Sequence, residues 1–336
     1  MTEGQITIVD VAAAAGVSVA TVSKVINDRY GVAEKTSARV RAVIDELGYT
    51  SSLVAQSLRS RRSNVIGILV SDIESFNAEL LKGAARAIRG TGYDLVVFSD
   101  CGQREDQVGW ERRSLARVSA LTDGAILVTP SGIDVTSSAP IVAVDHNVQS
   151  STLPTVDADN LSGAVTATEH LIRLGHRRIG FLAGRPDLES ARLREQGYRQ
   201  ALEAAGIPFD PNLVRVGSYQ PEAAREATRD LLAGEPRPTA IFAANDASAI
   251  ETIAVAKALG LTVPGDLSVV GFDNVPESAL CEPALTTVEQ PIQRMGEEAV
   301  RLLLALIDDP TGLPAQVVLP TRLVERASCR ALVESA

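Results

Sequence analysis

Cysteine and histidine are scarce in this chain, which limits the chemistry that it can host. Only three residues of each kind occur among 336. Cys101, Cys281 and Cys329 are odd in number and far apart, so neither a disulfide framework nor a zinc motif is expected. The histidines are too dispersed for a metal cluster. The sequence therefore predicts no metal site and no cofactor.

Long apolar runs and export signals are also missing. No run approaches the roughly 20 apolar residues of a membrane-spanning helix. The first residues lack the charged start, apolar middle and small-residue cleavage site of a secretory signal. These absences predict a cytoplasmic protein without a membrane partner, and they disfavour a sugar-binding transport protein.

Common enzyme signatures are absent as well. The chain has no Gly-x-Gly-x-x-Gly, no Gly-Lys-Ser/Thr phosphate-binding loop and no Gly-x-Ser-x-Gly elbow. An enzyme on a doubly wound fold is therefore a disfavoured alternative, and the chain is not expected to catalyse a reaction.

Charge is distributed unevenly along a chain that is long enough for two or three domains. Residues 1–62 carry eight Lys/Arg and six Asp/Glu, a net charge of +2. The remainder carries 32 − 8 = 24 against 42 − 6 = 36, a net charge of −12. Nucleic-acid contact is therefore expected at the N-terminal segment only.

Residues 7–27 predict two short helices joined by a tight turn. Thr7 is the expected cap of a helix over residues 8–15, Gly16 opens the turn, and Ser18 caps the second helix. Such a pair places its second helix in the DNA major groove; a small helical hairpin within a larger core is the alternative. The second helix has apolar Val22, Val25 and Ile26 on one face and polar Thr21, Ser23, Lys24 and Asn27 on the other.

This stretch, over residues 7–12, 15–18 and 21–27, closely resembles the start of the LacI/GalR family of bacterial transcription regulators. The resemblance implies a dimeric, ligand-responsive DNA-binding protein. Lys24 is expected to reach guanine acceptors, while the apolar pair Val19 and Ala20 favours thymine methyl groups. The residues expected to hold phosphates or to position the helix are Thr7, Ser18, Thr21, Ser23 and Asn27.

A third helix is predicted over residues 34–47, closed by Gly48, and it completes a headpiece over residues 1–50. Residues 51–63 have the composition of a linker with one or two helical turns. Its family counterpart is a hinge helix that orders on DNA, where a leucine matching Leu58 wedges between base pairs. We include Ala55 with Leu58 among the expected DNA contacts; a solvated basic linker is the alternative.

The chain departs from the family pattern at two places before residue 64. Ala33 stands where the family usually has a serine cap, which weakens the start of the third helix by about 1 kcal/mol. Ser51 stands where proline is common, so the start of the hinge is less rigidly set.

From residue 64 onward, apolar runs alternate with helical patterns, which predicts doubly wound parallel sheets in two similar α/β subdomains. The resemblance implies a two-lobed domain like type I periplasmic binding proteins, used for effector binding and dimerisation, with an N-subdomain at about 64–158 and 289–317 and a C-subdomain at about 159–286 and 318–330. The expected strands are 65–70, 95–98, 124–128, 141–144, 179–182, 213–216, 240–243 and 267–272, with two more near Val317 and Val324; the expected helices are 78–89, 107–117, 161–174, 190–205, 221–232, 247–259 and 295–307.

Polar residues follow several of these strands, and the cleft between the lobes is the expected ligand site. Residues 175–181, 190–198, 244–246 and 270–273 look like effector-domain signatures of the family. Asn245 and neighbouring Asp246 have helix capping as the alternative, an arginine can form a surface ion pair, and the loop before Ser75 lacks a proline often seen there. By resemblance, effector contacts come from Arg194, Asn245 and Asp273 in one lobe, from Ser75, Phe76 and Asp145 in the other, and from Tyr219 as a stacking ring.

Taken together, these features predict a homodimeric repressor that binds a pseudo-palindromic operator and senses a small sugar or sugar derivative. A purine or nucleoside effector is the alternative within the same class, because Phe76 and Tyr219 can sandwich a planar ring.

Overall fold

The computed structural model describes residues 6–26, 30–49, 62–99, 107–130, 139–146, 153–309 and 316–332. Asn27, Ala55, Leu58 and Cys101 lie outside these ranges, as does most of the expected hinge. The chain divides into two compact units, residues 1–63 and 64–336. Among the described residues, no single helix is long and apolar enough to cross a membrane.

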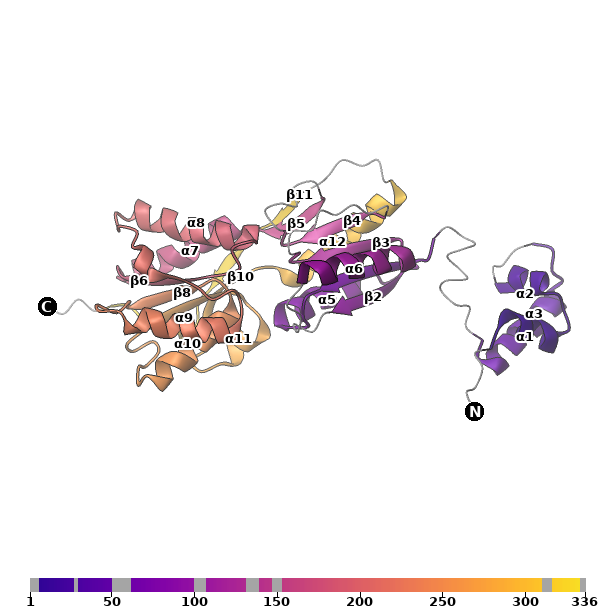
Figure 1. The fold of residues 1–336 in the computed structure, drawn as a ribbon, viewed down its shortest axis with the longest axis horizontal. Coiled ribbons are helices and arrows are strands. Elements are labelled where there is room, and N and C mark those ends of the chain that lie inside the picture. Colours follow the sequence, from indigo (N-terminus) through magenta and orange to yellow (C-terminus); the bar gives the residue numbers. More distant parts are fainter. Residues whose placement is uncertain are drawn as a thin grey trace. The chain divides into compact units, whose positions relative to one another are not determined.

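The first unit contains a three-helix headpiece, drawn in indigo in Figure 1. Gly16 and Gly48 close the first and third helices in the left-handed region, with φ of 62° and 61°. The headpiece has its own apolar core, so a hairpin buried in a larger core is wrong. The helices are α1 (Ile8–Ala15), α2 (Val19–Ile26) and α3 (Glu34–Leu47), and the core consists of Val11, Ala12, Ala15, Val22, Val25 and Val40.

The first lobe of the second unit is built on a parallel sheet with strand order β11-β5-β4-β3-β1-β2. Because strand side chains alternate, Ile66 and Ile68 pack with α5 and α12 on one face, while Leu69 packs with α6 on the other. The elements are β1 (Val65–Val70), α5 (Ser75–Ala87), β2 (Asp94–Ser99), α6 (Gln107–Leu121), β3 (Gly124–Val128), β4 (Ile141–Val144), β5 (Thr155–Ala158), α12 (Ile292–Asp308) and β11 (Gln316–Leu319).

The second lobe repeats this plan with strand order β12-β10-β9-β8-β6-β7, in which only the pairing of β12 with β10 is antiparallel among the described strands. Helices α7 and α8 cover one face and α9 and α10 the other. The elements are α7 (Asn160–Arg173), β6 (Ile179–Ala183), α8 (Glu189–Ala204), the 3-10 turn η1 (Pro211–Leu213), β7 (Val214–Val216), α9 (Pro221–Ala233), β8 (Ala240–Ala243), α10 (Asp246–Ala258), β9 (Ser268–Asp273), α11 (Pro276–Leu280), β10 (Thr286–Glu289) and β12 (Arg322–Val324).

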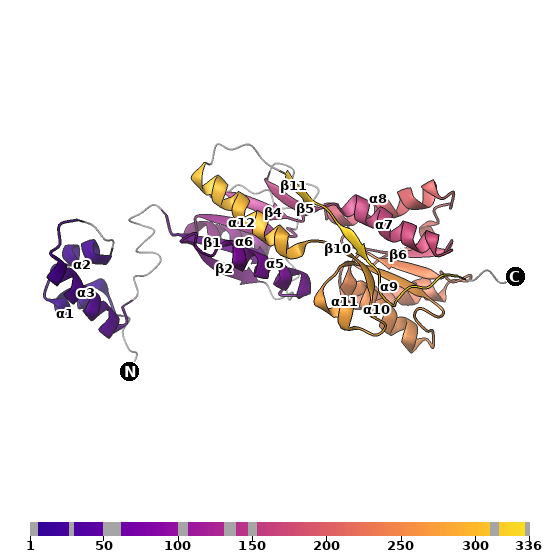
Figure 2. The same ribbon diagram turned by 180° about the vertical axis from the view of Figure 1, so that it is seen from behind.

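Three segments connect the two lobes, and they run side by side in Figures 1 and 2. They lead from β5 to α7, from β10 to α12, and from β11 to β12. Two of them are tied together, because Asp159 N–H donates to the carbonyl of Leu319 at 2.8 Å and Thr321 Oγ1 donates to the carbonyl of Asp159 at 3.2 Å. Two of the three connections are thus held together at the boundary between the lobes.

The predicted two-lobed architecture is confirmed, and several elements differ in detail. Helix α5 begins at Ser75 rather than at residue 78, so Ser75 and Phe76 lie in its first turn and not in a loop. Strands β5 and β10 and helix α11 were not predicted. Both strands are rich in polar residues, and their burial is permitted by hydrogen bonds such as Thr155 Oγ1 to Asp157 Oδ2 at 2.8 Å.

Candidate functional site

Helix α2 presents a polar face on the surface of the headpiece. Val22 and Val25 are buried in the headpiece core, whereas Ala20 and Lys24 are exposed. Val19, expected to face DNA bases, is half-buried against the same core, so only part of its side chain is free for contact.

The hydroxyl groups at the helix starts are engaged within the headpiece. Ser18 Oγ accepts from Thr21 N–H at 3.2 Å and lies 2.9 Å from Thr21 Oγ1. Thr7 Oγ1 donates to Asp10 Oδ2 at 2.7 Å, and Thr7 N–H donates to the same oxygen at 2.8 Å. These bonds fix where α1 and α2 begin, and they agree with the helix caps that the sequence predicts at Thr7 and Ser18.

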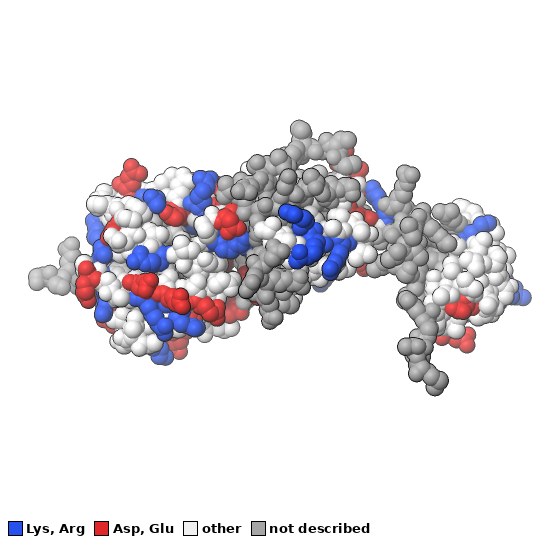
Figure 3. All heavy atoms as spheres, viewed as in Figure 1, with Lys and Arg blue, Asp and Glu red and all other residues white. Residues whose placement is uncertain are grey.

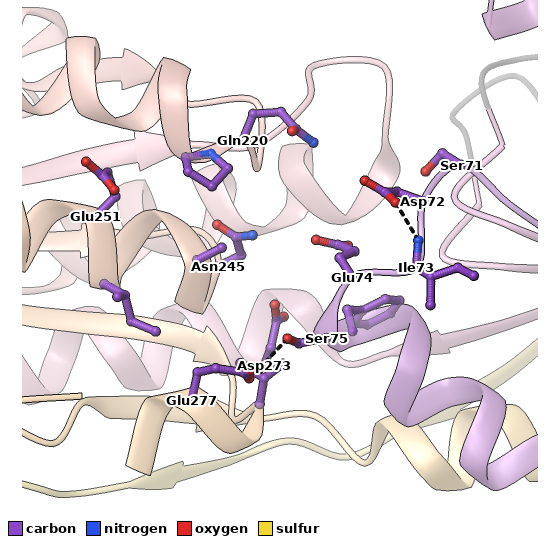
Figure 4. Close-up of a pocket in the computed structure, with 15 residues that line it drawn as sticks. Ser71, Asp72, Ile73, Glu74, Ser75, Gln220, Asn245, Glu251, Asp273 and Glu277 are labelled. Atoms are coloured by element: carbon purple, nitrogen blue, oxygen red, sulfur yellow. Dashed lines mark hydrogen bonds between the residues drawn. The ribbon is translucent and has the colours of Figure 1, made fainter. Parts of the chain in front are cut away.

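In the second unit, a cavity of about 490 Å³ opens between the lobes (Figure 4). Its first-lobe wall is residues 71–76, which follow β1 and begin α5. Its second-lobe wall comes from the starts of α9 and α10 and from the end of β9. The cavity thus lies outside the carboxyl ends of parallel strands, the usual ligand position in such folds.

A smaller pocket of about 40 Å³ shares Glu74, Phe76, Asn245 and Asp273 with this cavity. We call it the inner pocket. All seven predicted effector residues line one or both spaces. Thr129, Gln220 and Gln290, which were not predicted, line them too. Gln290 could have been found from the sequence only by recognising β10, because it directly follows that strand.

Arg194 is the central cation of the inner pocket. It is 3% exposed, its Nε donates to Asn160 Oδ1 at 2.9 Å, and its Nη1 donates to the carbonyl of Ala244. Its guanidinium lies 3.9 Å from the centre of the Phe272 ring, a favourable cation–π arrangement. Arg194 therefore has a fixed position, and a surface ion pair is the wrong description of it.

Two buried carboxyls face Arg194 from opposite lobes. Asp273 Oδ1 lies 3.7 Å from Arg194 Nη1 and accepts from Gln290 Nε2 at 2.5 Å. Burial raises the pKa of Asp273 to about 7, although the Arg194 charge opposes the rise. Burial likewise raises the pKa of Asp145, again against Arg194. Asp145 Oδ1 is buried and has no hydrogen-bond partner among the described residues.

Asn245 both caps a helix, as the alternative interpretation predicted, and lines the pocket. Its Oδ1 accepts from Ser248 N–H at 3.0 Å at the start of α10, while its Nδ2 lies 3.5 Å from the carbonyl of Tyr219. Neighbouring Asp246 is fully buried and accepts from Thr287 Oγ1 at 2.5 Å and from Val275 N–H at 2.9 Å. Asp246 is thus part of the supporting structure.

Strained backbone collects at the inner pocket. Thr129, Asp145, Tyr219 and Asp273 have positive φ values of 47°, 53°, 64° and 120°, and all four line the pocket. Residues other than glycine adopt this region at a cost of about 1–3 kcal/mol, and they cluster at functional sites. The strain aims side chains from four strand ends at a single space.

The lobes touch directly at two points. Ser75 Oγ donates to Glu277 Oε1 at 2.7 Å, a bond between lobes that is drawn in Figure 4. At another point, Glu189 N–H of α8 donates to the carbonyl of His146, which follows β4. A ligand that alters the separation of the lobes must alter these contacts.

This chain combines a helix-turn-helix unit with a two-lobed domain whose cleft is lined by polar residues. That combination defines the class of ligand-responsive DNA-binding proteins. The family profile of bacterial regulatory proteins of the lacI family matches residues 7–52, and that of a periplasmic binding protein-like domain matches residues 168–329.

Individual relatives cover nearly the whole chain. It is 35% identical over 312 residues to the HTH-type transcriptional repressor PurR of Photobacterium profundum, covering 90% of this chain and 92% of that protein. A transcriptional regulator CelR–cellobiose complex is 33% identical, with a TM-score of 0.74 and coverage of 96% and 99%. The lac repressor dimer bound to operator and the anti-inducer ONPF is 29% identical, with a TM-score of 0.83 and coverage of 97% and 99%.

The chain belongs to the LacI family of bacterial regulatory proteins. It is a DNA-binding repressor that responds to a small-molecule effector, and it is not an enzyme.

Proposed function

We propose that this repressor binds a pseudo-palindromic operator as a homodimer in the cytoplasm and that a small sugar or sugar derivative in the interlobe cleft controls it. The proposed assembly is supported by the lac repressor dimer bound to operator. That structure is similar to 97% of this chain. A two-fold symmetric dimer presents two recognition helices, which calls for two related half-sites.

On the DNA side, α2 supplies the contacts in this proposal. Exposed Lys24 reaches base acceptors, while Ala20 and the free part of Val19 meet thymine methyl groups. Thr21 and Ser23 are half-buried on the same short helix and approach phosphates. Asn27, Ala55 and Leu58 complete the proposed contacts from outside the described residues.

The sugar proposal rests on one observation: seven polar or aromatic side chains from both lobes line the cavity and the smaller pocket that shares residues with it. Asp145 and Asp273 offer acceptors to sugar hydroxyls, Asn245 offers an amide, and Tyr219 offers a ring for a pyranose face. The related regulator CelR, which is 33% identical to this chain, was solved as a complex with cellobiose.

Control of DNA binding follows from the contacts between the lobes. An effector shifts an equilibrium only by binding one arrangement of the protein better than another. A ligand held by Asp145 and Arg194 at the same time spans both lobes, so it favours one setting of the Ser75–Glu277 and Glu189–His146 contacts. Typical couplings are about 1–3 kcal/mol, or about 5- to 150-fold in affinity.

The test is fluorescence anisotropy of the full-length protein on labelled DNA from upstream of its own gene, at fixed salt. Cellobiose, ribose, glucose, their phosphates and purines are added in turn. We expect tight binding that one sugar shifts by at least about fivefold. A shift caused by a purine instead would contradict the sugar effector and select the alternative.

The nucleobase alternative stays in this panel for a specific reason. Phe76 and Tyr219 both line the inner pocket, and aromatic rings are side chains on which a planar base can stack. The 35% identity to a repressor named PurR is a second reason to include purines.

A further inference from the structure

The cleft between the lobes is strongly acidic. Six carboxyl side chains line the outer cavity and the inner pocket, and the only basic side chain among the described lining residues is Arg194. Figure 3 shows Lys and Arg side chains of the first lobe gathered elsewhere, over α6, where Arg112, Arg113 and Arg117 are exposed. The six carboxyls belong to Asp72, Glu74, Asp145, Glu251, Asp273 and Glu277.

The charge of Arg194 is offset in part within the protein. Its guanidinium faces both Asp145 and Asp273, and two of its nitrogens donate to Asn160 and Ala244. Because the guanidinium already donates to two fixed acceptors and faces two carboxyls, its attraction for a further anion is reduced, and Arg194 alone does not make the pocket an anion site.

Three carboxyls at the mouth of the cavity have no such compensation. Asp72 Oδ1 accepts from Ile73 N–H at 2.7 Å and Glu277 accepts from Ser75 Oγ at 2.7 Å, both neutral donors. Within the described ranges, no basic group lies within 4 Å of Asp72, Glu74 or Glu277. Glu251 differs, since Arg225 Nε lies 2.6 Å from its Oε1.

Glu74 occupies the middle of this group. Its carboxylate extends from the first lobe into the cavity toward Asn245 (Figure 4). The side chain is open to water, yet it is surrounded by both walls of the cleft. That desolvation and the nearby Asp72 raise the pKa of Glu74. One more negative group beside Glu74 would therefore be strongly disfavoured.

Two helix N-termini that open on the cleft, those of α5 and α10, do not restore a positive potential. At α10, Asn245 Oδ1 takes the N–H of Ser248, and the buried carboxyl of Asp246 lies in the first turn. At α5, Glu74 stands at the cap position. Carboxyls at these two places complement the helix dipoles, so the dipoles are not available to a phosphate.

The carboxyl of Asp145 lacks a hydrogen-bond donor at one of its oxygens within the described ranges. Asp145 is 9% exposed, and its Oδ1 has no hydrogen-bond donor among the described residues. A buried carboxylate oxygen without a partner is costly, and an O–H or N–H group of a ligand in the inner pocket would satisfy it.

We propose that the cleft takes a ligand that is rich in hydroxyl or amine donors and carries no negative charge, and that Asp72, Glu74 and Glu277 exclude phosphorylated and carboxylated ligands. This inference rests on the proposed effector function of the cleft. It narrows the effector to neutral or amine-bearing sugars, or to uncharged nucleosides in the alternative. Electrostatic mismatch at the cavity mouth is the physical basis of the exclusion.

The test compares ligands that share a scaffold and differ in charge. Cellobiose, glucose, ribose and adenosine are each titrated calorimetrically into the full-length protein beside the corresponding phosphate, and glucosamine is included as an amine. For every scaffold that binds, the phosphate is expected to bind at least about tenfold more weakly, which corresponds to about 1.4 kcal/mol. In Glu74→Gln this ratio should fall, because one of the three carboxyls has lost its charge.

Glu226→Gln is the matched control. Glu226 is an exposed residue of α9 that does not line the cleft, so the same change of net charge should leave the ratio as in the wild type. Asp72→Asn serves as a second variant should Glu74→Gln fold poorly.

Each outcome separates the inference from the proposed function. A phosphate that binds as well as its parent, or a ratio unchanged in both Glu74→Gln and Asp72→Asn, overturns the charge exclusion and leaves a sugar effector in place. If no scaffold binds in any charge form, the proposed effector class and the inference both fail. Operator binding of the same sample then shows whether the protein was intact.

Discussion

Gly184 holds open the space that the Tyr219 ring occupies, and replacing it tests the geometry of the inner pocket. A Cβ atom at residue 184 would lie 2.0 Å from Tyr219 Cζ and 2.4 Å from its Cε1 and Oη. Ordinary contacts begin at 3.4 Å, so the ring would have to move by about 3.4 − 2.0 = 1.4 Å. Positive φ values at Ser218 and Tyr219 leave the backbone little freedom to follow.

We expect Gly184→Ala to lower the free energy of unfolding of the 64–336 unit by about 1–3 kcal/mol, the usual cost of overpacking. Loss of the ring's contact with a ligand should weaken effector binding by a further 0.5–1.5 kcal/mol, roughly 2- to 12-fold. Urea denaturation of the full chain measures the first effect, and ligand titration measures the second.

Two further variants make this prediction specific. Gly217→Ala is the control, because its Cβ would meet Ala224 at an ordinary 3.5 Å and should cost less than about 0.5 kcal/mol. In a Tyr219→Ala background, the ring is gone and the penalty of Gly184→Ala should disappear. A penalty that persists without the ring would refute the reasoning.

Two other predictions concern a titrating group and the headpiece. The pKa of Asp273 is about 7 in the folded protein, above the ordinary 3.8. Between these two values the native state holds a proton that the unfolded chain has released. The stability that this proton contributes is lost as pH rises through about 7. Wild type should therefore lose stability relative to Asp273→Asn between pH 5.5 and 7, by at most about 1.4 kcal/mol per pH unit in urea titrations, and parallel pH profiles would contradict this. Val22 is fully buried in the small headpiece core, so Val22→Ala should cost about 2 kcal/mol there and weaken operator binding in anisotropy, while ligand titration of the cleft is unchanged; an unaffected operator affinity would argue against the packing described.

Helices and strands with an apolar pattern could be predicted from the sequence, whereas polar strands could not. The bounds of β1, β3, β4, β8 and α3 were predicted correctly because apolar runs or helical periodicity mark them. Strand β10 escaped prediction because its sequence, Thr-Thr-Val-Glu, has no apolar run and is buried with the help of a bond from Thr287 to Asp246. That bond joins residues 41 positions apart and has no local signal.

The candidate site divides in the same way. Polar residues after apolar strands, such as Asp145 and Asp273, could be predicted because strand ends meet at one edge of a sheet. The acidic mouth could not, because Ser75 and Glu277 lie 202 positions apart and meet only when the two lobes face each other. The exact start of α5, which turns Glu74 into the cavity, likewise depends on tertiary contacts.

The most direct test of the account measures operator affinity with and without the effective ligand in wild type and Asp145→Asn. Asparagine has the shape of aspartate, and Asp145 Oδ1 makes no hydrogen bond with the described residues that the change would break. Asp230→Asn, an exposed change on α9, is the control. The account predicts equal operator affinity in all three proteins without ligand and a ligand-induced shift of about 5- to 150-fold in wild type and control only. An equal shift in Asp145→Asn would contradict the claim that the interlobe cleft controls DNA binding.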